Sequence, residues 1–149
     1  MARIGIFGAG YVGLVTGACF AKLGHTVVLR DVVPEKVERL RDPDAELPIY
    51  EPGLKELIAE CGDRISFTLE LDEVVKDAEF LYIAVDTPEG ASGNAELRSV
   101  WNVVDSIPAD LPGPPVVVMK STVPVGTGAQ VRARLDARRL TGYSYVSNP

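Results

Sequence analysis

The sequence has little cysteine and little histidine, and these shortages exclude several kinds of site. It contains two cysteines, Cys19 and Cys61, and one histidine, His25, in 149 residues. Two thiols far apart in a chain of this length suggest a reducing compartment rather than a disulfide framework. His25 has no partner of a metal-ligating type nearby, so no metal site is expected. We therefore expect a cytoplasmic protein.

Basic residues are scarce relative to acidic ones. Lys and Arg number 15 and Asp and Glu 21, which gives a net charge of −6. Binding to duplex nucleic acid needs a basic stripe, so no nucleic-acid partner is expected. A nucleotide remains compatible with this charge, because the N-terminus of a helix binds phosphate through backbone N–H groups.

One uncharged run, residues 4–21, reaches the length of a short membrane span. Five glycines interrupt this run, namely Gly5, Gly8, Gly10, Gly13 and Gly17. Its first part is a strand pattern that ends in a glycine turn, which suits neither a membrane span nor a signal peptide. Neither membrane association nor export is expected.

Strand-like and helix-like segments alternate along the whole chain. Short apolar runs predict strands at residues 3–7, 26–30, 65–68, 80–85, 116–119 and 143–146. Helical spacing predicts helices at residues 11–23, 34–40, 54–61, 72–76, 97–107 and 126–138, with a loop at 42–52 and a turn-rich segment at 87–94. Such alternation is typical of parallel strands joined by right-handed crossovers. We therefore predict a single α/β domain over residues 1–149, with a doubly wound, Rossmann-like parallel sheet.

The two cysteines fall on apolar faces of predicted helices. Val12 and Val15 share a face with Cys19, and Leu57 shares one with Cys61. Since apolar residues at helical spacing usually face the core, we expect both thiols to be buried and unreactive.

Residues 8–13 read Gly-Ala-Gly-Tyr-Val-Gly, directly after one predicted strand and at the start of a helix. This is the context that the dinucleotide-binding pattern G-x-G-x-x-G requires. Gly8 permits the tight turn, Gly10 lets a pyrophosphate approach the backbone, and Gly13 lets the helix pack close to the sheet. The helix N-terminus adds free N–H groups and a partial positive charge. A turn that serves packing alone is the alternative.

An acidic residue, Asp31, ends the second predicted strand, 18 residues after Gly13. This matches the acid, about 20 residues on, that accepts hydrogen bonds from the adenosine ribose. A carboxylate there repels the 2′-phosphate of NADP, so NAD is favoured. Arg30 is expected to point to the opposite face, because neighbouring side chains alternate along a strand. A solvated strand end is the alternative for Asp31.

Four blocks of sequence, in the same order, resemble the UDP-glucose/GDP-mannose dehydrogenase family. They are residues 8–21, 48–54 (Pro-Ile-Tyr-Glu-Pro-Gly-Leu), 120–127 (Lys-Ser-Thr-Val-Pro-Val-Gly-Thr) and 146–149. Tyr50 in the second block points to the members that act on UDP-glucose. The resemblance implies an N-terminal NAD-binding domain of an enzyme that oxidises the C6 alcohol of a UDP-sugar, here UDP-glucose to UDP-glucuronate, with two NAD molecules in turn.

The resemblance also implies partners and limits. Members continue beyond residues 148–149 into a central helix, a sugar-binding domain and a cysteine that traps the aldehyde, so no catalytic residue is expected in this chain and the chain alone is expected to be inactive. The full-length enzyme is expected to be a homodimer. The alternative is a stand-alone NAD-binding or sensing module that acts through a protein partner.

Site residues follow from matching the family's motifs position by position. The implied cofactor-binding residues are Gly8, Gly10, Tyr11, Val12 and Gly13 at the phosphates, Asp31 and Lys36 at the adenosine, Val85 and Thr87 along the dinucleotide, and Ser121 and Thr122 near the nicotinamide ribose. The Thr122 hydroxyl would also help to position the reacting water.

Simpler interpretations remain open for some of these positions. Ser121 or Thr122 could only cap the following helix, Lys36 could be only a solvated helix residue, and block 48–54 could be structural. Asp86 departs from the family, which more often has Gly or Asn there. Since a carboxylate is unfavourable beside a pyrophosphate, Asp86 is expected to point away or to weaken binding. The turn at residues 90–94 is also irregular for the family.

Overall fold

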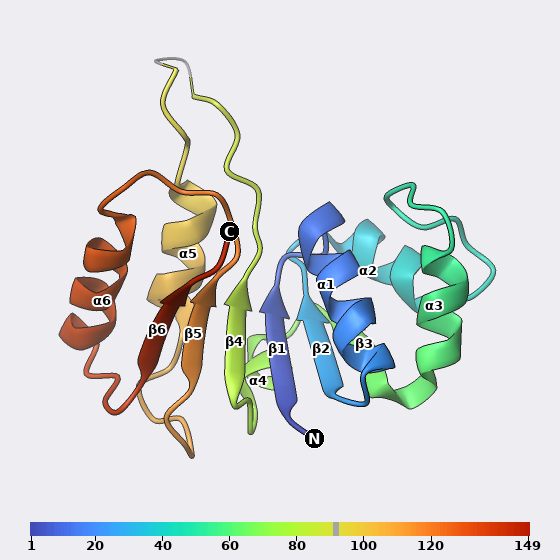
Figure 1. Ribbon diagram of the computed structural model, residues 1–149, viewed down its shortest axis with the longest axis horizontal. Coiled ribbons are helices and arrows are strands. Elements are labelled where there is room, and N and C mark those ends of the chain that lie inside the picture. The colour runs from blue at the N-terminus through green and yellow to red at the C-terminus, as the bar shows by residue number, and fades with distance from the viewer. Residues whose placement is uncertain (91–92) are drawn as a thin grey trace.

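Six strands form one parallel sheet in the order β3-β2-β1-β4-β5-β6 in the computed structural model, which describes residues 1–90 and 93–149 (Figure 1). The strands are β1 (Arg3–Phe7), β2 (Thr26–Arg30), β3 (Ile65–Thr68), β4 (Phe80–Ile83), β5 (Val116–Met119) and β6 (Ser144–Ser147). Every neighbouring pair is parallel. The prediction of a doubly wound Rossmann-like sheet is confirmed.

The helices join the strands as the alternation predicted. They are α1 (Tyr11–Lys22), α2 (Pro34–Arg41), α3 (Leu54–Cys61), α4 (Leu71–Val75), α5 (Arg98–Ser106) and α6 (Thr127–Ala137), with a short 3-10 helix at Gly62–Arg64. The turn-rich segment 87–94 and the irregular turn at residues 90–94 fall partly on residues 91 and 92, which lie outside the described residues. No helix in the described part of the chain is long and apolar enough to cross a membrane.

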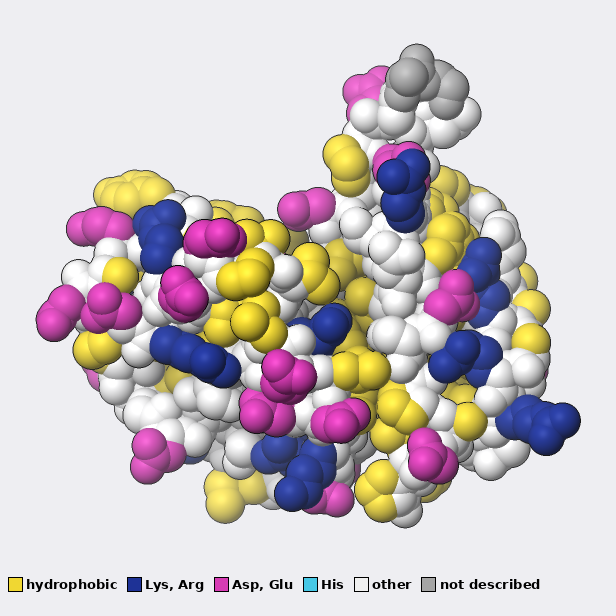
Figure 2. Space-filling view, turned by 180° about the vertical axis from the view of Figure 1, so that it is seen from behind, with side chains coloured by type: hydrophobic (Ala, Val, Ile, Leu, Met, Phe, Trp, Pro, Cys, Tyr) yellow, Lys and Arg dark blue, Asp and Glu magenta, His cyan; other side chains and the backbone are white. Residues whose placement is uncertain are grey.

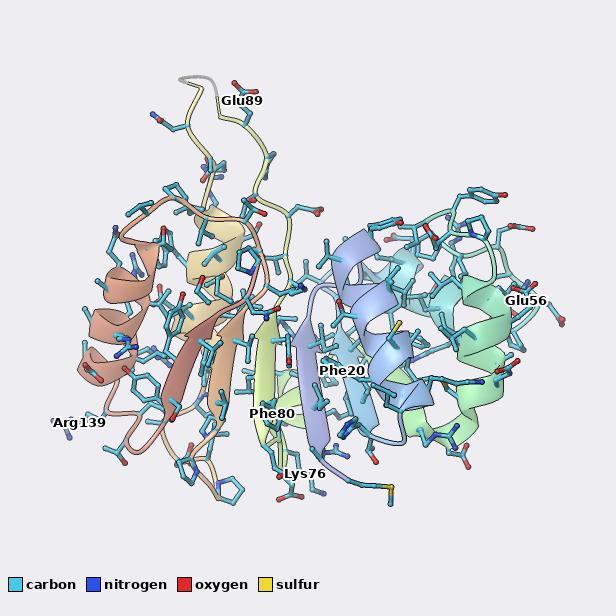
Figure 3. The ribbon with its side chains drawn as sticks, viewed as in Figure 1. Phe20, Glu56, Lys76, Phe80, Glu89 and Arg139 are labelled. Carbon is cyan, nitrogen blue, oxygen red and sulfur yellow. The ribbon has the colours of Figure 1, made fainter. Side chains whose placement is uncertain are left out.

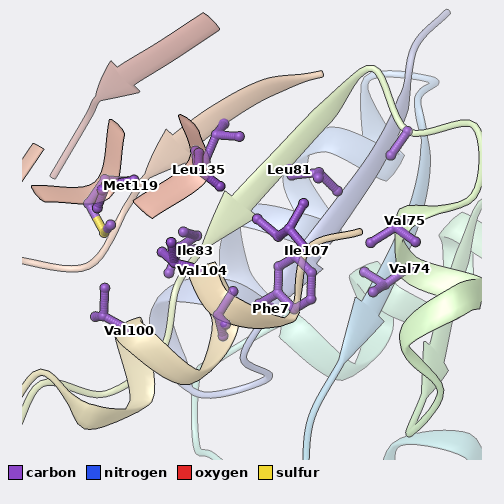
Figure 4. Close-up of a cluster of buried hydrophobic side chains, with 14 of the residues drawn as sticks. Phe7, Val74, Val75, Leu81, Ile83, Val100, Val104, Ile107, Met119 and Leu135 are labelled. Carbon is purple, nitrogen blue, oxygen red and sulfur yellow. The ribbon is translucent and has the colours of Figure 1, made fainter. Parts of the chain in front are cut away.

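Two hydrophobic cores lie on opposite faces of the sheet. One packs α4, α5 and α6 against the strands, and Figure 4 shows its side chains around Phe7 and Leu81. The other packs α1, α2 and α3 around Ile6 and Leu29. Burial on both faces explains why the strands are apolar at nearly every position.

The order of the strands reverses between β1 and β4. The chain runs outward from β1 to β3, then returns to the other side of β1 and continues from β4 to β6. In open α/β sheets, ligands bind at the carboxyl ends of the strands where the order reverses. A ligand site is therefore expected at the loops that follow β1, β2, β4 and β5.

Strand β4 is two residues shorter than the predicted strand at residues 80–85. The Ile83 carbonyl accepts hydrogen bonds from the N–H groups of both Lys120 and Ser121, at 2.9 Å each. Beyond this shared carbonyl the regular ladder between β4 and β5 ends. The Ala84 N–H still donates to the Phe7 carbonyl of β1 at 2.8 Å, and Ala84 and Val85 line the carboxyl edge of the sheet.

The prediction for Cys61 is confirmed, because its side chain is buried, but the prediction for Cys19 is wrong, because its side chain is exposed. Helix α1 turns a different face to the sheet, made mostly of small residues such as Gly17 and Ala18. A Cβ at Gly17 would lie only 2.9 Å from Leu29 Cδ1, so the helix lies very close to the sheet. Small residues add little to a hydrophobic pattern, and the larger residues on the outer face misled the prediction.

Candidate functional site

The glycines of the turn after β1 have different surroundings. Gly8 has φ +102°, and a Cβ there would lie 2.4 Å from the Ala84 carbonyl oxygen. A Cβ at Gly13 would lie 1.9 Å from the Gly8 carbonyl oxygen. A Cβ at Gly10 would meet nothing closer than Asp86 Oδ1, at 3.5 Å. The fold therefore requires Gly8 and Gly13, whereas Gly10 leaves an open cradle.

This cradle lies at the start of α1. Gly10 is the N-cap residue and makes no side-chain capping bond, and the first turn of the helix contains no acidic residue. The N–H groups of that turn and the partial positive charge of the helix end are thus available to an anion. A turn that serves packing alone does not need this open side.

Asp31 is buried, with only 8% of its surface exposed. Its Oδ2 accepts hydrogen bonds from the Ala9 N–H and from Lys36 Nζ, both at 2.9 Å, and its Oδ1 accepts one from the Val33 N–H at 3.1 Å. Burial alone would raise the pKa of Asp31, but these hydrogen bonds outweigh it and hold the pKa below its ordinary value of 3.8. Asp31 is therefore a fixed, ionised carboxylate rather than a solvated strand end.

Lys36, on the first turns of α2, is the ionic partner of Asp31. The interpretation of Lys36 as a merely solvated residue is therefore wrong. Arg30 ends β2, and Asp31 already lies beyond the strand, so strict alternation does not apply between them. Both residues line the same pocket, although Arg30 Nε donates to the Leu69 carbonyl at 3.0 Å.

One pocket at the carboxyl edge, here called the β2 pocket, has a volume of about 330 Å³. It is lined by the predicted residues Gly8, Gly10, Asp31, Lys36 and Val85, together with Arg30, Val32, Val33, Ala84, Asp86, Ser99, Asn102, Val103 and Ser106. Figure 2 views the molecule from behind and shows hydrophobic side chains gathered around a hollow in the middle of the visible surface. The pocket thus joins polar groups to apolar walls, as a nucleoside site requires.

Sequence reasoning missed the walls of the β2 pocket. Val32 and Val33 directly follow Asp31, and this pair of apolar residues next to the acid was the signal available in the sequence. Ser99, Asn102 and Ser106 lie on α5, about 70 residues further along the chain, and only the crossover of the chain brings them here. No local sequence pattern predicts that residues of α5 line this pocket.

A second pocket, here called the β5 pocket, has a volume of about 180 Å³ and lies between the loops after β1, β4 and β5. It is lined by the predicted residues Tyr11, Val12, Val85, Thr87, Ser121 and Thr122, together with Ala84, Asp86 and Lys120. Every predicted site residue except Gly13 therefore lines one of the two pockets. Gly13 instead packs against the backbone of Gly8.

Ser121 and Thr122 have different environments despite being neighbours. The buried Ser121 hydroxyl donates to the Val85 carbonyl at 2.7 Å, which ties the loops after β4 and β5 together. Thr122 is exposed, and its carbonyl accepts a hydrogen bond from Thr87 Oγ1 at 3.0 Å. Neither side chain caps α6, whose N-cap is Gly126, so the capping interpretation is wrong.

Block 48–54 is connected to the turn after β1. The Tyr11 hydroxyl donates a hydrogen bond to Glu51 Oε2. This hydrogen bond and the charge of Glu51 raise the pKa of Tyr11 above its ordinary value of 10.0. Gly53, with φ +79°, then leads into α3, while Tyr50 is 88% exposed. The block therefore has a structural role at its end and a contact with the site at Glu51.

Asp86 does not point away, contrary to one expectation from the sequence. Its side chain lines both the β2 pocket and the β5 pocket, and its Oδ1 is the atom nearest to the open side of Gly10. The described residues contain no group of three or more His, Cys, Asp or Glu side chains arranged to hold a metal ion. A wider depression of about 770 Å³, beside the start of β6, lies at the opposite edge of the sheet.

Comparisons with known proteins agree with this geometry. The model of the "UDP-glucose/GDP-mannose dehydrogenase family, NAD binding domain" matches residues 2–149. UDP-glucose 6-dehydrogenase of Pseudomonas aeruginosa is 47% identical over 99% of this chain and 34% of its own length. UDP-glucose 6-dehydrogenase TuaD of Bacillus subtilis is 40% identical over 100% of this chain and 33% of its own.

Solved structures give the same result. A UDP-glucose dehydrogenase from the archaeon Pyrobaculum islandicum superposes with a TM-score of 0.88 at 40% identity, over 100% of this chain and 36% of that one. A GDP-mannose dehydrogenase from Pseudomonas aeruginosa, solved as a ternary complex, superposes with a TM-score of 0.86 at 30% identity over the same shares. The chain thus spans about a third of the length of the relatives it matches.

Proposed function

Because this chain belongs to the UDP-glucose/GDP-mannose dehydrogenase family and matches its NAD-binding domain, we propose that it supplies the cofactor site of an enzyme that oxidises a UDP-sugar. NAD is the cofactor of this domain. The observation that carries the proposal is the open cradle at Gly10, which shares one pocket with the fixed carboxylate of Asp31. A diphosphate and a ribose diol need these two features side by side.

The phosphates would lie over the cradle. The N–H groups at Tyr11 and Val12 begin the helix and would bind the diphosphate, and Gly8 and Gly13 would hold the turn that presents them. Binding of this kind needs no basic side chain, which agrees with the net charge of −6.

The adenosine half would occupy the β2 pocket. Asp31 would accept hydrogen bonds from the ribose diol, with Lys36 and the Ala9 N–H holding its carboxylate in place. Val32 and Val33 would form the apolar wall for the adenine. A 2′-phosphate would bring a second negative charge beside Asp31, so NAD is preferred to NADP.

The nicotinamide half would occupy the β5 pocket. Val85 and Thr87 would line the dinucleotide, and Ser121 would fix the loop that carries Thr122 through its bond to the Val85 carbonyl. The exposed Thr122 hydroxyl would be free to position a water. NAD, when bound, supplies the acceptor of the hydride.

We extend the proposal to the whole enzyme, with UDP-glucose as substrate and UDP-glucuronate as product. Conversion of an alcohol to a carboxylate consumes two NAD and one water and yields two NADH and three protons. The sugar site and the aldehyde-trapping cysteine would lie outside residues 1–149, which we propose to be one NAD-binding domain. A homodimeric, cytoplasmic enzyme belongs to the same proposal, and the two free cysteines support a reducing compartment.

Calorimetric titration of this chain with NAD and NADP tests the cofactor site. We expect NAD to bind more tightly, and a chain that binds neither cofactor would refute the proposal. Incubation with UDP-glucose and NAD tests the division of roles. We expect no NADH to form without the sugar-binding part, and robust turnover by this chain would contradict that division.

A further inference from the structure

We propose that Asp86 makes this site distinguish the oxidised cofactor from the reduced one, in favour of NAD⁺ over NADH. The inference rests on the proposed function, since it assumes that the dinucleotide spans the two pockets. It concerns Asp86, a residue outside the set of cofactor-binding residues that the resemblance implies.

Asp86 occupies the junction of the two pockets. Among the residues that the structure describes, it is the one acidic residue that lines both the β2 pocket and the β5 pocket. Its Oδ1 lies 3.5 Å from the position that a Cβ on Gly10 would take. A dinucleotide that lies across both pockets would therefore pass beside this carboxylate.

Asp86 is exposed, and its carboxylate has no partner in the described part of the chain. Within residues 1–90 and 93–149, it takes part in no hydrogen bond and no ion pair, whereas Asp31 accepts bonds from three donors. Three cations line the two pockets: Lys36 is paired with Asp31, Arg30 Nε donates to the Leu69 carbonyl at 3.0 Å, and Lys120 Nζ donates to Asn148 Oδ1 at 3.2 Å. None of them forms an ion pair with Asp86 in the described residues, so its negative charge acts on whatever occupies the junction.

The two redox forms of the cofactor respond differently to this charge. Both carry the same diphosphate, so the repulsion between Asp86 and the diphosphate weakens both forms equally. Only NAD⁺ carries a positive charge on its nicotinamide ring, so only NAD⁺ gains an attraction that offsets the repulsion. Across several ångströms of partly screened solvent, this attraction changes the ratio of affinities by about three- to tenfold. The effect falls as salt is added.

This preference suits an enzyme that oxidises an alcohol to a carboxylate. The two hydrides must leave through the same cofactor site, so one NADH has to be exchanged for a fresh NAD⁺ before the second step. A site that binds NADH less tightly than NAD⁺ promotes this exchange. The cost is a weaker hold on the diphosphate of either form.

Titration with three ligands separates the two effects of Asp86. ADP-ribose carries the diphosphate without nicotinamide, and NAD⁺ and NADH differ in the charge of the ring. In Asp86→Asn we expect the affinity for ADP-ribose and NADH to rise by a similar factor, and the affinity for NAD⁺ to rise less. The ratio of the NADH and NAD⁺ dissociation constants should fall by about three- to tenfold.

Two further variants control the experiment. Glu89→Gln removes a charge from the arm that extends beyond β4, where Glu89 lies far from the sheet and lines neither pocket (Figure 3), so the ratio should not change. Asp86→Glu keeps the charge and should keep most of the preference. Added salt should reduce the ratio in the native chain and leave it nearly constant in Asp86→Asn.

The possible failures are distinguishable. An unchanged ratio in Asp86→Asn, with all three ligands still binding, would overturn the inference and leave the proposed function intact. A native chain that binds none of the three ligands would overturn the proposed function itself.

Discussion

The two pockets at the carboxyl edge of the sheet differ in how completely the chain prepares them. In the β2 pocket, the carboxylate of Asp31 is buried and bonded to three donors before any ligand arrives. In the β5 pocket, Thr122 is exposed and its hydroxyl makes no hydrogen bond within the described residues. The carboxylate of the β2 pocket is therefore fixed in advance, whereas Thr122 in the β5 pocket, and Asp86 at the junction of both pockets, remain available to a ligand or to the rest of an enzyme.

The preorganisation of Asp31 explains why a fixed group suits binding, whereas free groups suit a reaction. A carboxylate that is already fixed loses little freedom when a ribose binds to it, so its hydrogen bonds contribute to affinity. A catalysed reaction needs hydroxyls and charged groups that can interact with the substrate. Such groups cannot all be held in hydrogen bonds within the domain.

Gly13→Ala is expected to have the largest effect, because it removes the turn on which both pockets depend. The added Cβ would lie 1.9 Å from the Gly8 carbonyl oxygen, and backbone atoms cannot easily move away. We expect a loss of about 4 kcal/mol or more in the free energy of unfolding, measured with urea. Gly113→Ala is the control, since a Cβ there meets nothing within 4 Å. Equal stability of the two variants would contradict this account.

Gly10→Val is expected to spare the fold and remove the ligand. Within 4 Å, a Cβ at Gly10 meets only Asp86 Oδ1, so the side chain would fill the cradle rather than clash with the backbone. We expect unfolding close to that of the native chain and a loss of about a hundredfold in NAD affinity, measured by calorimetry. Native affinity for NAD would show that the diphosphate does not bind here.

Asp31→Ala is expected to act on the choice of cofactor. Without the carboxylate, NAD loses a ribose acceptor and NADP loses a repulsion, so the preference for NAD should narrow by about tenfold. Titration with both cofactors measures this. Glu35→Gln, a charge change at an exposed position on the following helix α2, should leave the preference intact. An unchanged preference in Asp31→Ala would exclude Asp31 from the ribose site.

Ser121→Ala and Thr122→Ala compare two neighbours on one loop. Ser121→Ala removes the bond to the Val85 carbonyl, and we expect a loss of about 1 kcal/mol in the free energy of unfolding. Thr122→Ala removes an exposed hydroxyl and should leave stability unchanged. Urea unfolding of both variants tests this, and equal losses would show that Ser121 does not tie the two loops together.

The pH dependence of stability should reveal Asp31 only in acid. Its pKa is lower in the folded chain than the ordinary value of 3.8, so its carboxylate stabilises the fold above that value. This contribution should be lost as the pH falls below about 4 and through the folded pKa. Urea unfolding between pH 6 and pH 3 should show a smaller acid loss in Asp31→Asn than in the native chain. Parallel curves would argue against a fixed, ionised Asp31.

The sequence predicted most of the fold correctly, for identifiable reasons. Alternating strands and helices, with glycines after the first strand, were visible as local patterns, and all six strands lie within two residues of their predicted bounds. The errors have physical causes as well. Cys19 was assigned to the wrong face because the real inner face of α1 consists mostly of small residues. Strand β4 was predicted too long because pairing with its neighbours β1 and β5, rather than the local sequence, decides where the strand ends.

The candidate site was predictable where one motif carries it and unpredictable where distant segments meet. Gly10 and Asp31 were found from spacing alone, and the structure brings them into one pocket. The contribution of Asn102 and the orientation of Asp86 were not found. Each depends on where α5 and the loop after β4 come to lie against β1, and no local pattern encodes that placement.

Taken alone, the order of the residues was enough to specify the turn, the acid that follows it and the family, because short-range sterics and hydrogen bonds act within a few positions. Assembly in three dimensions was needed to bury Asp31 under three donors and to set Asp86 at the junction of the two pockets. Burial and electrostatic environment depend on segments brought together by the packing of the sheet, and they arise only once the chain has folded.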